Sequence, residues 1–515
     1  MAHCLKFYLS HDKIDPPMDN VNKHCILSTD QMDKVDQSSI DELKKLGKTG
    51  AELMEAAGLS VVRTITSDCN GQNVLVLCGP GNNGGDGFVV AHHLQKMSFN
   101  VEVALLCELA DLKGDALTMA NRWVGGVVPI SPEILSGKDI IVDAIFGTGL
   151  SKEINGHLKE TLEAANEIKA HKISIDIPSG VKGDTGEVLG VAFKADKTIT
   201  FSRKKPAHLL YPGKALCGDI LVAEIGVPDQ IVNDIGPDIF CNNPELWNKF
   251  IPRFEGSIHK YQKGHAVVVS GNMIQTGASR MAAMAALRIG AGLVSVSSPE
   301  DALQTHAAHL TGIMIRRREQ LTKDLQDDRL NVWCIGPAAG VNDITKKNVL
   351  KIVKSGRKVV LDADALTVFE GGPLELFEAI NSTAKSECVL TPHAGEFARI
   401  FPYLKKLDKI TAAKNAAKLS GAVLIYKGAD TVIASPDGRC VISDNAMPTL
   451  ATAGSGDVLA GILTGFLAQN MPVFEAACAA VWIHSECGKL FGEGLIAEDL
   501  PGLIPQVLEI VKSIK

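Results

Sequence analysis

The sequence predicts two α/β domains, each built on a doubly wound, mostly parallel sheet. A chain of 515 residues is longer than one compact domain usually is, since domains average roughly 150 residues. Short apolar β runs alternate with helical patterns in both halves, and this alternation requires the crossover connections of parallel sheets. Hydrophobic residues make up 46% and charged residues 22% of the chain, which is ordinary globular usage and argues against disorder.

The first half begins with a loosely ordered lead-in, residues 1–27, and two helical patterns at 29–46 and 49–66. Six β runs then alternate with helices, at 73–78, 101–107, 139–145, 172–177, 197–201 and 220–225. A polar stretch with turn residues, 227–244, ends this series. The first domain is therefore predicted to span residues 28–243.

The second half contains a second series, so the second domain is predicted to span residues 247–515. Its β runs lie at 266–270, 331–335, 358–362, 387–391 and 422–426. Helices are predicted between them at 279–289, 346–354 and 411–419, and an apolar helix follows residue 457.

Composition and charge exclude several classes of protein. The net charge of −7 and the pI near 6.1 give no electrostatic reason to bind DNA or RNA. No apolar run approaches the 18 or so residues of a membrane span, and the first 23 residues contain no hydrophobic core of a signal peptide. The 12 cysteines are scattered without a CxxC pair, as in reducing compartments. We expect a cytoplasmic protein whose partners are small molecules and, in a homo-oligomer, copies of itself.

A glycine-rich motif, GPGNNGGDG at residues 79–87, follows the first β run and precedes an apolar helix. Its glycines let the backbone approach a ligand and point N–H groups at an anion beside the helix N-terminus. A tight turn alone would not need two amides and a carboxylate. Phosphate or dinucleotide binding is therefore favoured over a purely structural turn.

Two further polar strand ends follow in the same domain. Asp143 precedes Gly147-Thr148-Gly149, and Asp176 precedes Pro178-Ser179-Gly180. Each aspartate alone is more simply explained as a turn or cap residue. Three polar strand ends in one domain favour a shared site, whose Asn and Asp oxygens suit a hard cation and whose carboxylate suits acid–base chemistry.

The second half carries AGSGD, residues 453–457, directly before an apolar helix. Small residues at a helix N-terminus present backbone N–H groups to a phosphoryl group, and Asp457 would accept the proton of an attacking hydroxyl. As a bare pattern, a helix cap with a first-turn aspartate is the alternative. There is no Walker A motif, so a P-loop is not the phosphate-binding device.

Three other motifs end β runs of this half: DADAL at 362–366, TPHAGE at 391–396 and KGADT at 427–431. Taken singly, His393 would be a structural histidine and Lys427 a solvated lysine. Together they are predicted to line one rim of one sheet, where Lys427 meets nucleotide phosphates and His393 a substrate.

The first half resembles the epimerase domain of NAD(P)H-hydrate repair proteins, the YjeF N-terminal type. The resemblance is carried by three motifs in their order along the chain, GPGNNGGDG, DAIFGTGL and DIPSG. The resemblance covers about residues 28–243. It implies a Rossmann-like domain that interconverts the R and S forms of NAD(P)H hydrated at C6 of the nicotinamide. It also implies that Asp176 is the acid–base group, and that Asn83, Asp143 and Ser179 bind a potassium ion. For Lys205 a basic surface turn is the favoured explanation, and assistance to Asp176 is the alternative. The implied hydrate contacts are Asn82, Asn83, Gly84, Gly85, Asp86, Gly147, Thr148, Gly149, Leu150, Ser151, Lys152, Glu153 and Asp176.

Residues 247–515 resemble the ribokinase-like dehydratase domain of the same family. The resemblance is carried by AGSGD, TPHAGE, KGADT and the stretch from Gly264 to Val296. The implied reaction phosphorylates the C6 hydroxyl of the S hydrate and then expels phosphate to restore NAD(P)H. Mg²⁺ would accompany the nucleotide, with ADP favoured over ATP. Asp457 would be the base, and Gly454, Ser455 and Gly456 the anion hole. The implied hydrate contacts are Ala278, Gly340, His393, Ala394, Gly395, Glu396, Phe397, Ala398, Arg399 and Asp457. The implied nucleotide contacts are Lys427, Gly428, Ala429, Asp430, Thr431, Met447, Pro448, Thr449, Leu450, Ala451, Thr452, Ala453, Gly454, Ser455 and Gly456.

The sequence departs from the family pattern at Ala338, where glycine is usual, and at Ala394, where proline is usual. Ala338 would be strained if its φ were positive. Two rival hypotheses stay open: a vitamin or sugar kinase fused to a dinucleotide-binding domain, and a nucleotide-binding interaction module without enzymatic activity.

Overall fold

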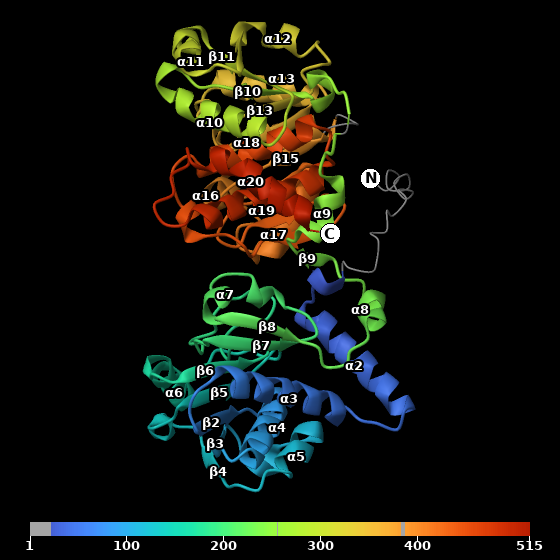
Figure 1. The fold of residues 1–515 in the computed structure, drawn as a ribbon, viewed down its shortest axis with the longest axis vertical. Helices are drawn as coiled ribbons and strands as arrows, with labels where there is room; N and C mark the ends of the chain where they lie inside the picture. The colour runs from blue at the N-terminus through green and yellow to red at the C-terminus, as the bar shows by residue number, and fades with distance from the viewer. Residues whose placement is uncertain (1–21, 255, 383–386, 515) are drawn as a thin grey trace.

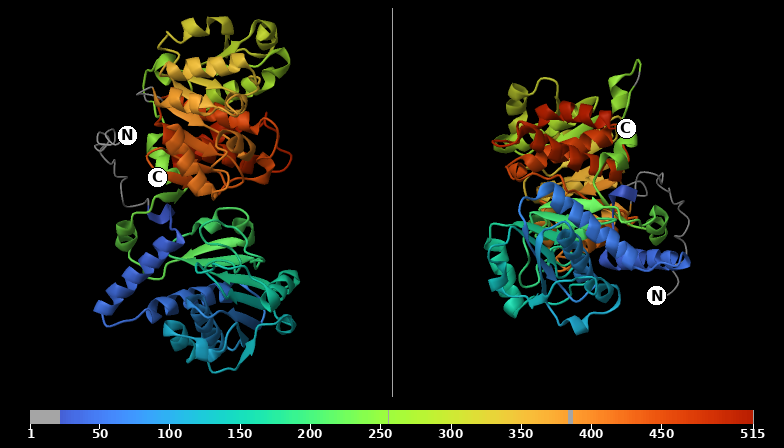
Figure 2. Two further views of the ribbon diagram at one scale, coloured as in Figure 1. Left: turned by 180° about the vertical axis from the view of Figure 1, so that it is seen from behind. Right: turned by 60° about the horizontal axis from the view of Figure 1, so that its bottom comes forward.

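A computed structural model describes residues 22–254, 256–382 and 387–514 of the chain. Two sheets form two stacked bodies, the N-terminal one blue to green and the C-terminal one yellow to red in Figure 1. Helices cover both faces of each sheet, and the view from behind in Figure 2 shows the same two bodies. The predicted fold class, two doubly wound α/β domains, is confirmed.

The N-terminal sheet has seven parallel strands in the order β4-β3-β2-β5-β6-β7-β8. They are β2 (Asn73–Cys78), β3 (Asn100–Leu105), β4 (Val127–Pro129), β5 (Ile140–Ala144), β6 (His171–Ile175), β7 (Lys197–Phe201) and β8 (Asp219–Ala223). The helices of this body are α2 (Thr29–Lys45), α3 (Ala51–Asp68), α4 (Asn82–Lys96), α5 (Gly114–Ala120), α6 (Gly156–Glu167), α7 (Gly213–Leu216) and α8 (Asp229–Ile235).

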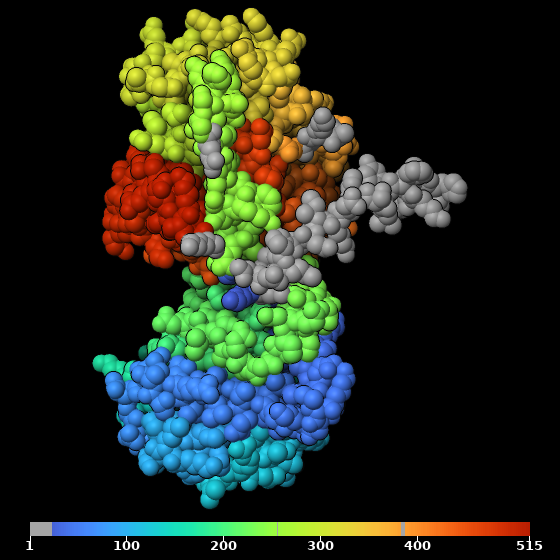
Figure 3. Space-filling model, turned by 45° about the vertical axis from the view of Figure 1, so that its right-hand side comes forward, coloured from blue at the N-terminus to red at the C-terminus, as the bar shows by residue number. Residues whose placement is uncertain are grey.

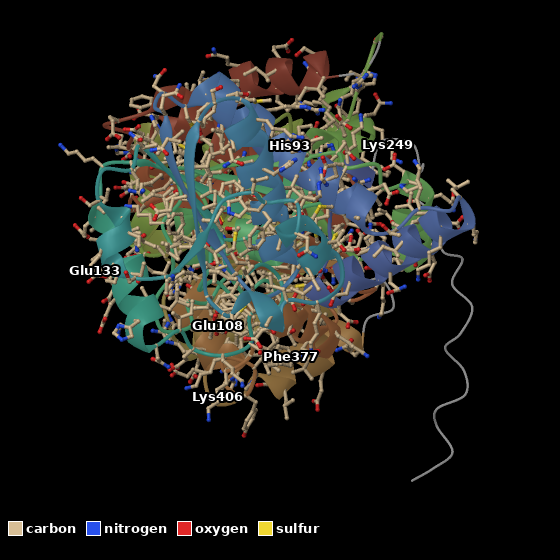
Figure 4. The ribbon with its side chains drawn as sticks, turned by 90° about the horizontal axis from the view of Figure 1, so that it is seen from below. His93, Glu108, Glu133, Lys249, Phe377 and Lys406 are labelled. Carbon is tan, nitrogen blue, oxygen red and sulfur yellow. The ribbon has the colours of Figure 1, made fainter. Side chains whose placement is uncertain are left out.

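Alternate side chains of the central strand β2 face two separate cores. Val76 packs with Phe88 of α4 on one face, whereas Leu75 packs with Leu162 of α6 on the other. Both faces are buried, which explains why the central strands read as continuous apolar runs. On the outside of this layer, His93 of α4, labelled in Figure 4, lies 2.7 Å from a carboxylate oxygen of Glu55 on α3.

The C-terminal sheet has eleven strands in the order β1-β9-β18-β17-β16-β15-β14-β13-β10-β11-β12. From β16 to β12 the neighbours are parallel, and β17 and β18 add an antiparallel edge. The strands are β1 (Cys25–Ile26), β9 (Ile239–Cys241), β10 (His265–Val269), β11 (Leu293–Ser298), β12 (Met314–Arg317), β13 (Val332–Ile335), β14 (Lys358–Leu361), β15 (Cys388–Leu390), β16 (Val423–Tyr426), β17 (Val432–Ala434) and β18 (Cys440–Ile442).

Helices α10, α18, α19 and α20 cover one face of this sheet, and α13, α15 and α17 cover the other. The helices of this body are α9 (Pro244–Trp247), α10 (Thr276–Arg288), α11 (Leu303–His309), α12 (Leu321–Asp324), α13 (Asp343–Lys354), α14 (Asp364–Thr367), α15 (Leu374–Asn381), α16 (Ala394–Ile400), α17 (Lys409–Ser420), α18 (Ser455–Ala468), α19 (Val473–Phe491) and α20 (Leu500–Ser513).

Two short strands pair across the predicted domain boundary. Strands β1 and β9 lie in regions assigned to the lead-in and to the first domain, yet they pair with each other and β9 pairs with β18 of the second sheet. These short strands are defined by their partner strands, which no local pattern reveals. Residues 1–21 of the predicted lead-in lie outside the described residues. After β9, the green segment in Figure 3 runs along the surface of the C-terminal body, where Trp247 is buried against Trp482 of α19.

Every predicted β run corresponds to a strand, and no end differs by more than two residues. Seven strands do not appear as apolar runs because they are very short or contain serine or arginine, namely β1, β4, β9, β11, β12, β17 and β18. Within the described parts of the chain, no helix has both the length and the apolar character that crossing a membrane requires.

Candidate active sites

A cavity of about 510 Å³ opens beside the carboxyl ends of β2, β5 and β6 in the N-terminal body. Helices α2 and α3 supply another wall through Asp36 and Met54, among others. The predicted hydrate contacts that line this cavity are Asn82, Asn83, Asp86, Gly147, Thr148, Gly149 and Asp176. The structure therefore brings all three N-terminal motifs to one cavity, as expected where strand ends of a parallel sheet meet.

The other predicted contacts lie outside the lining that the described residues form. Gly84 and Gly85 are buried in α4, where a Cβ on Gly84 would lie 1.9 Å from the carbonyl oxygen of Gly79. These glycines permit close packing of the helix instead. Leu150 is buried, and Ser151, Lys152 and Glu153 are exposed.

Asp176 lies directly after β6 with a φ of +65°, in the left-handed region that non-glycine residues seldom adopt. Its Oδ1 accepts hydrogen bonds from Lys205 Nζ at 2.7 Å and from Thr200 Oγ1 at 2.9 Å. Lys205 is 1% exposed. The interpretation of Lys205 as part of a basic surface turn was therefore wrong, because η4 (Pro206–His208) turns the chain inward and the ammonium group is needed beside a buried carboxylate.

His208 fixes the backbone around this ion pair. Its Nδ1 accepts a hydrogen bond from the Lys205 N–H at 2.9 Å, so its Nε2 carries the proton and donates to the Asp176 carbonyl oxygen at 2.8 Å. Burial and the Lys205 charge lower the pKa of His208 to about 4. A neutral His208 thus joins both residues of the pair.

The carboxyl groups around the cavity differ in their acidity. Burial raises the pKa of Asp176, but the Lys205 ammonium outweighs it and holds the pKa below the usual range. Burial raises the pKa of Asp36 to about 6 and that of Asp86 well above its usual value. Asp176 is therefore the group whose carboxylate form the site favours, whereas burial of Asp36 and Asp86 favours their protonated forms.

One of the predicted potassium ligands, Asp143, is a fully buried carboxylate. Ser179 donates to Asp143 through its Oγ at 2.6 Å and through its N–H at 2.7 Å, while Ser174 donates at 3.1 Å. No cationic side chain pairs with Asp143 among the described residues, and burial raises its pKa to about 6. The side-chain oxygens of an amide, a carboxylate and a hydroxyl suit a hard cation, and the buried Asp143 carboxylate lacks a cationic partner among the described residues, so the donor set fits the implied ion.

In the C-terminal body, the predicted motifs follow β13, β14, β15 and β16, neighbouring parallel strands of the sheet. Asp457 lies in the first turn of α18, whose N-cap Gly454 has a φ of +90°. This conformation suits glycine. The Ser455 N–H donates to the Thr452 carbonyl oxygen at 3.3 Å, so the next N–H groups of the first turn are the ones available to an anion.

Lys427 connects the strand ends to the start of α18. Its Nζ donates to Asp362 Oδ1 at 2.7 Å, and Thr391 Oγ1 donates to the same oxygen at 2.7 Å. A Cβ placed on Gly456 would lie 3.5 Å from Lys427 Nζ. Burial and the Asp362 charge raise the pKa of Asp457 to about 6, against the lowering effect of Lys427. The site thus combines a carboxyl group, a cation and a helix N-terminus.

His484 is a functional candidate that the sequence motifs did not identify. It is buried in α19, and its Nε2 lies 3.0 Å from both Ser455 Oγ and the Ser455 carbonyl oxygen. Burial lowers the pKa of His484 to about 4. As a neutral side chain it holds the residue that begins α18.

Several other predicted residues occupy this rim. Gly340 donates its N–H to Asp364 at 2.8 Å, and His393 caps α16 and pairs with Glu396. Ala338 has a φ of +51°, so the expected strain is present. The remaining predicted hydrate contacts lie on two helices: Ala278 is near the start of α10, and α16 carries Ala394, Gly395, Ala398 and Arg399. The remaining predicted nucleotide contacts lie in two loops. The loop after β16 contains Gly428, Ala429 and Thr431, and the segment before α18 contains Met447, Pro448, Thr449, Leu450, Ala451, Thr452 and Ala453.

Two predicted contacts point elsewhere. Phe397 is fully buried and its ring stacks on Tyr426 at 4.2 Å, so its side chain belongs to the core. Asp430 accepts a hydrogen bond from the Tyr211 N–H at 3.0 Å and pairs with Lys409, so both of its oxygens are engaged at the junction with the N-terminal body.

Comparison with protein-family models matches both halves of the chain. Residues 50–207 match the model described as YjeF-related protein N-terminus. Residues 266–508 match the model described as NAD(P)H-hydrate dehydratase.

Individual relatives match nearly the whole chain. The bifunctional NAD(P)H-hydrate repair enzyme of Thermofilum pendens is 33% identical, over 92% of this chain and 96% of its own. The Escherichia coli protein of the same name is 31% identical, over 94% of each chain. Among solved structures, an ADP/ATP-dependent NAD(P)H-hydrate dehydratase from Bacillus subtilis, co-crystallised with ATP and Mg²⁺, is 25% identical with a TM-score of 0.46, covering 53% of this chain and 98% of that one.

Proposed function

The chain belongs to the family of bifunctional NAD(P)H-hydrate repair enzymes, and we propose that each half performs one step of that repair. The N-terminal half epimerises the R and S forms of NAD(P)H hydrate. The C-terminal half dehydrates the S form at the expense of ADP, giving NAD(P)H, phosphate and AMP. One observation carries this proposal: each half sets an aspartate near a lysine at the carboxyl edge of its own sheet, Asp176 with Lys205 and Asp457 near Lys427.

In the N-terminal cavity, Asp176 acts as the acid–base group at C6. Lys205 keeps it ionised and therefore able to accept a proton near neutral pH. The N-terminus of α4, at Asn82 and Asn83, supplies N–H groups that favour the pyrophosphate of the dinucleotide.

In the C-terminal site, Asp457 accepts the proton of the C6 hydroxyl as its oxygen attacks the terminal phosphorus of the nucleotide. The N–H groups at the start of α18, with Lys427 nearby, stabilise the charge on the transferring phosphoryl group. Phosphorylation turns the hydroxyl into a leaving group. Loss of phosphate from C6 and of a proton from C5 then restores the double bond of NAD(P)H.

Two cations complete the proposal. Potassium would be held by oxygens of Asn83, Asp143 and Ser179 and would supply a positive charge beside the buried Asp143 carboxylate. Mg²⁺ would accompany the nucleotide and neutralise its phosphates. The residue assignments for hydrate and nucleotide given above, a cytoplasmic location and a homo-oligomeric state belong to the same proposal. All eleven cysteines of the described residues are free thiols, which supports a reducing compartment.

Incubation with mixed R and S hydrates, ADP, Mg²⁺ and K⁺ tests the proposal. We expect the absorbance of reduced nicotinamide to return with one phosphate released for each hydrate consumed. A stable phosphorylated product would favour the kinase alternative, and the absence of any turnover would favour a binding module. Omission of potassium should slow only the conversion of the R hydrate.

A further inference from the structure

A second titratable carboxyl group reaches the epimerase cavity from outside the glycine-rich motifs. Helix α2 buries Met32, Val35 and Ser39. Asp36, one turn after Met32, is half-buried and lines the same cavity as Asp176. The element that carries Asp36 is thus a wall of the site, while Asp176 comes from the end of β6.

Helix α2 is fixed in this position at its first turn. The Thr29 N–H and the Thr29 hydroxyl donate to the two oxygens of Asp184, each at 2.7 Å. Asp184 belongs to the loop between β6 and β7, so this contact ties α2 to the segment that follows Asp176. Ser28 closes a capping box with Gln31. The position of Asp36 over the cavity is therefore built into the fold.

The carboxyl group of Asp36 is available for chemistry. No described residue donates a hydrogen bond to it or forms an ion pair with it. The pKa of Asp36 is raised to about 6, mainly by burial. The charges of Asp176 and Asp33 also raise this pKa, whereas the Lys205 charge opposes the rise. Asp86, whose own pKa is raised in part by Asp36, faces it as well. Two groups held at different acidity in one cavity are the usual arrangement for paired acid and base roles.

Inversion at C6 by loss and re-addition of water requires groups on both faces of the ring. The hydrate carries its hydroxyl on a carbon bonded to the ring nitrogen, so the nitrogen lone pair can expel that hydroxyl once it is protonated. The configuration inverts only if water then adds from the opposite face. One carboxylate on one wall serves one of these faces.

We propose that Asp36 is the second acid–base residue of epimerisation, acting on the face of the nicotinamide ring opposite Asp176. This inference rests on the proposed function. In one direction, the Asp36 carboxylic acid gives its proton to the C6 hydroxyl, the C6–O bond breaks, and water leaves as the nitrogen lone pair forms a C6=N1 bond. A second water adds to C6 from the other face and gives its proton to the Asp176 carboxylate. Proton exchange with solvent resets both groups, and the reverse reaction exchanges their roles.

The test compares Asp36→Asn with Asp41→Asn in the full-length protein. Asp41 lies on the same helix, is exposed, and pairs with Lys44 at 3.0 Å, so its change controls for the altered charge on α2. With purified R hydrate as substrate, we expect Asp36→Asn to epimerise about 100-fold more slowly and Asp41→Asn to match the wild type. Dehydration of the S hydrate should be unchanged in both, which shows that the chain is folded.

The pH profile distinguishes a chemical role from a structural one. The rate of wild-type epimerisation should change with pH near pH 6. Asp36→Asn should lose this change, whereas Asp36→Glu should keep a change of the same kind.

An isotope experiment tests the loss and re-addition of water. In ¹⁸O-labelled water, each inversion should place one labelled oxygen on C6. Epimerisation by Asp36→Asn at the wild-type rate with an unchanged profile would overturn the role of Asp36, as would inversion without labelling. If Asp36→Asn does not fold, Asp36→Ser takes its place with the same expectations. A wild-type protein that does not interconvert the hydrates would instead contradict the proposed function.

Discussion

Asp176 combines a left-handed backbone with a buried charge, and three neighbours hold it in place. Its φ of +65° costs on the order of 1–3 kcal/mol in a non-glycine residue. Lys205 and Thr200 bind its side chain, while His208 binds its carbonyl oxygen. Such strain is found where surrounding structure over-determines a residue, typically at active sites. The carboxylate is thus aimed by its surroundings.

Replacement of Lys205 should therefore disable epimerisation. Lys205→Met leaves Asp176 buried without its cation, so the Asp176 pKa should rise and epimerisation near neutral pH should fall by about 100-fold or more. Removal of one partner of a buried pair should destabilise the fold by about 3–5 kcal/mol. Because the folded-state pKa of Asp176 lies below its unfolded value, the pair stabilises the fold above that unfolded value and this contribution is lost as the pH falls. Denaturant titrations should show the largest difference near neutral pH and a smaller one in acid.

The control for this change is Lys182→Met, since Lys182 is a half-exposed lysine of the same domain that lies 3.9 Å from Glu187. It should alter neither stability nor epimerisation appreciably. A stability difference for Lys205→Met that grew as the pH fell would contradict the ion-pair explanation.

Asp457 should control only the dehydration step. Burial raises its pKa to about 6, so wild-type dehydration should fall as the pH drops below that value, because a base must be deprotonated to act. Asp457→Asn should abolish phosphate release and leave conversion of the R to the S hydrate unchanged. Assays of both steps on the same preparation provide the measurement, and loss of both activities together would count against two independent sites.

The positions of Asp176 and Asp457 could be predicted from sequence because each lies at a fixed place in a motif that ends a strand or starts a helix. Lys205 could not. Its neighbours Arg203 and Lys204 make a basic run that is typical of a surface, and its burial depends on where η4 turns and where Asp176 lies. Asp36 was missed for a similar reason, since an aspartate on an amphipathic helix is usually solvated.

At the scale of elements, the start of α18 shows how one glycine sets a binding surface. Gly454 has a φ of +90°, and a Cβ there would lie 2.6 Å from Met281 Cε and 3.0 Å from Ala497 Cβ. Gly454→Ala should therefore shift the first turn of α18 and its N–H groups, with a loss of dehydration of at least about 10-fold and of about 1–2 kcal/mol in stability.

Gly438 provides the matched control for this substitution. It has a φ of +99° in the turn between β17 and β18, and nothing lies within 4 Å of an added Cβ. Gly438→Ala imposes the same kind of backbone strain without crowding or contact with α18. It should lose a similar amount of stability in thermal unfolding but keep full dehydration activity. Equal loss of activity in both variants would show that general destabilisation explains the effect.

Strands were predictable where burial on both faces makes a continuous apolar run, as in β2 and β10. Strand β11 contains Ser295, Ser297 and Ser298, all fully buried, so its polar residues do not reveal from sequence that it lies inside the sheet. Strands β1 and β9 consist of two and three residues and exist through pairing with each other and with β18. Local propensity carries little information about such pairs.

Across the whole molecule, the segment after β7 contacts both bodies. Lys205 faces Asp176, whereas Lys204 pairs with Asp444 of the C-terminal body at 3.3 Å and Lys214 donates to the Asp444 carbonyl oxygen at 2.5 Å. These contacts, with the pairing of β1 and β9, hold the two bodies together. The cavity and the N-terminus of α18 nevertheless lie on different sheets.

Separate sites on one chain predict that two inactive halves complement each other. Asp176→Asn alone should consume the S hydrate and leave the R hydrate, after correction for spontaneous epimerisation, and Asp457→Asn alone should restore no NAD(P)H. In a mixture of the two proteins, the hydrate inverted by one can diffuse to the other, so both forms should be repaired completely. Absorbance of reduced nicotinamide and chiral separation of the remaining hydrate measure this. A mixture that still leaves the R hydrate would mean that the substrate must pass between two intact sites of one chain.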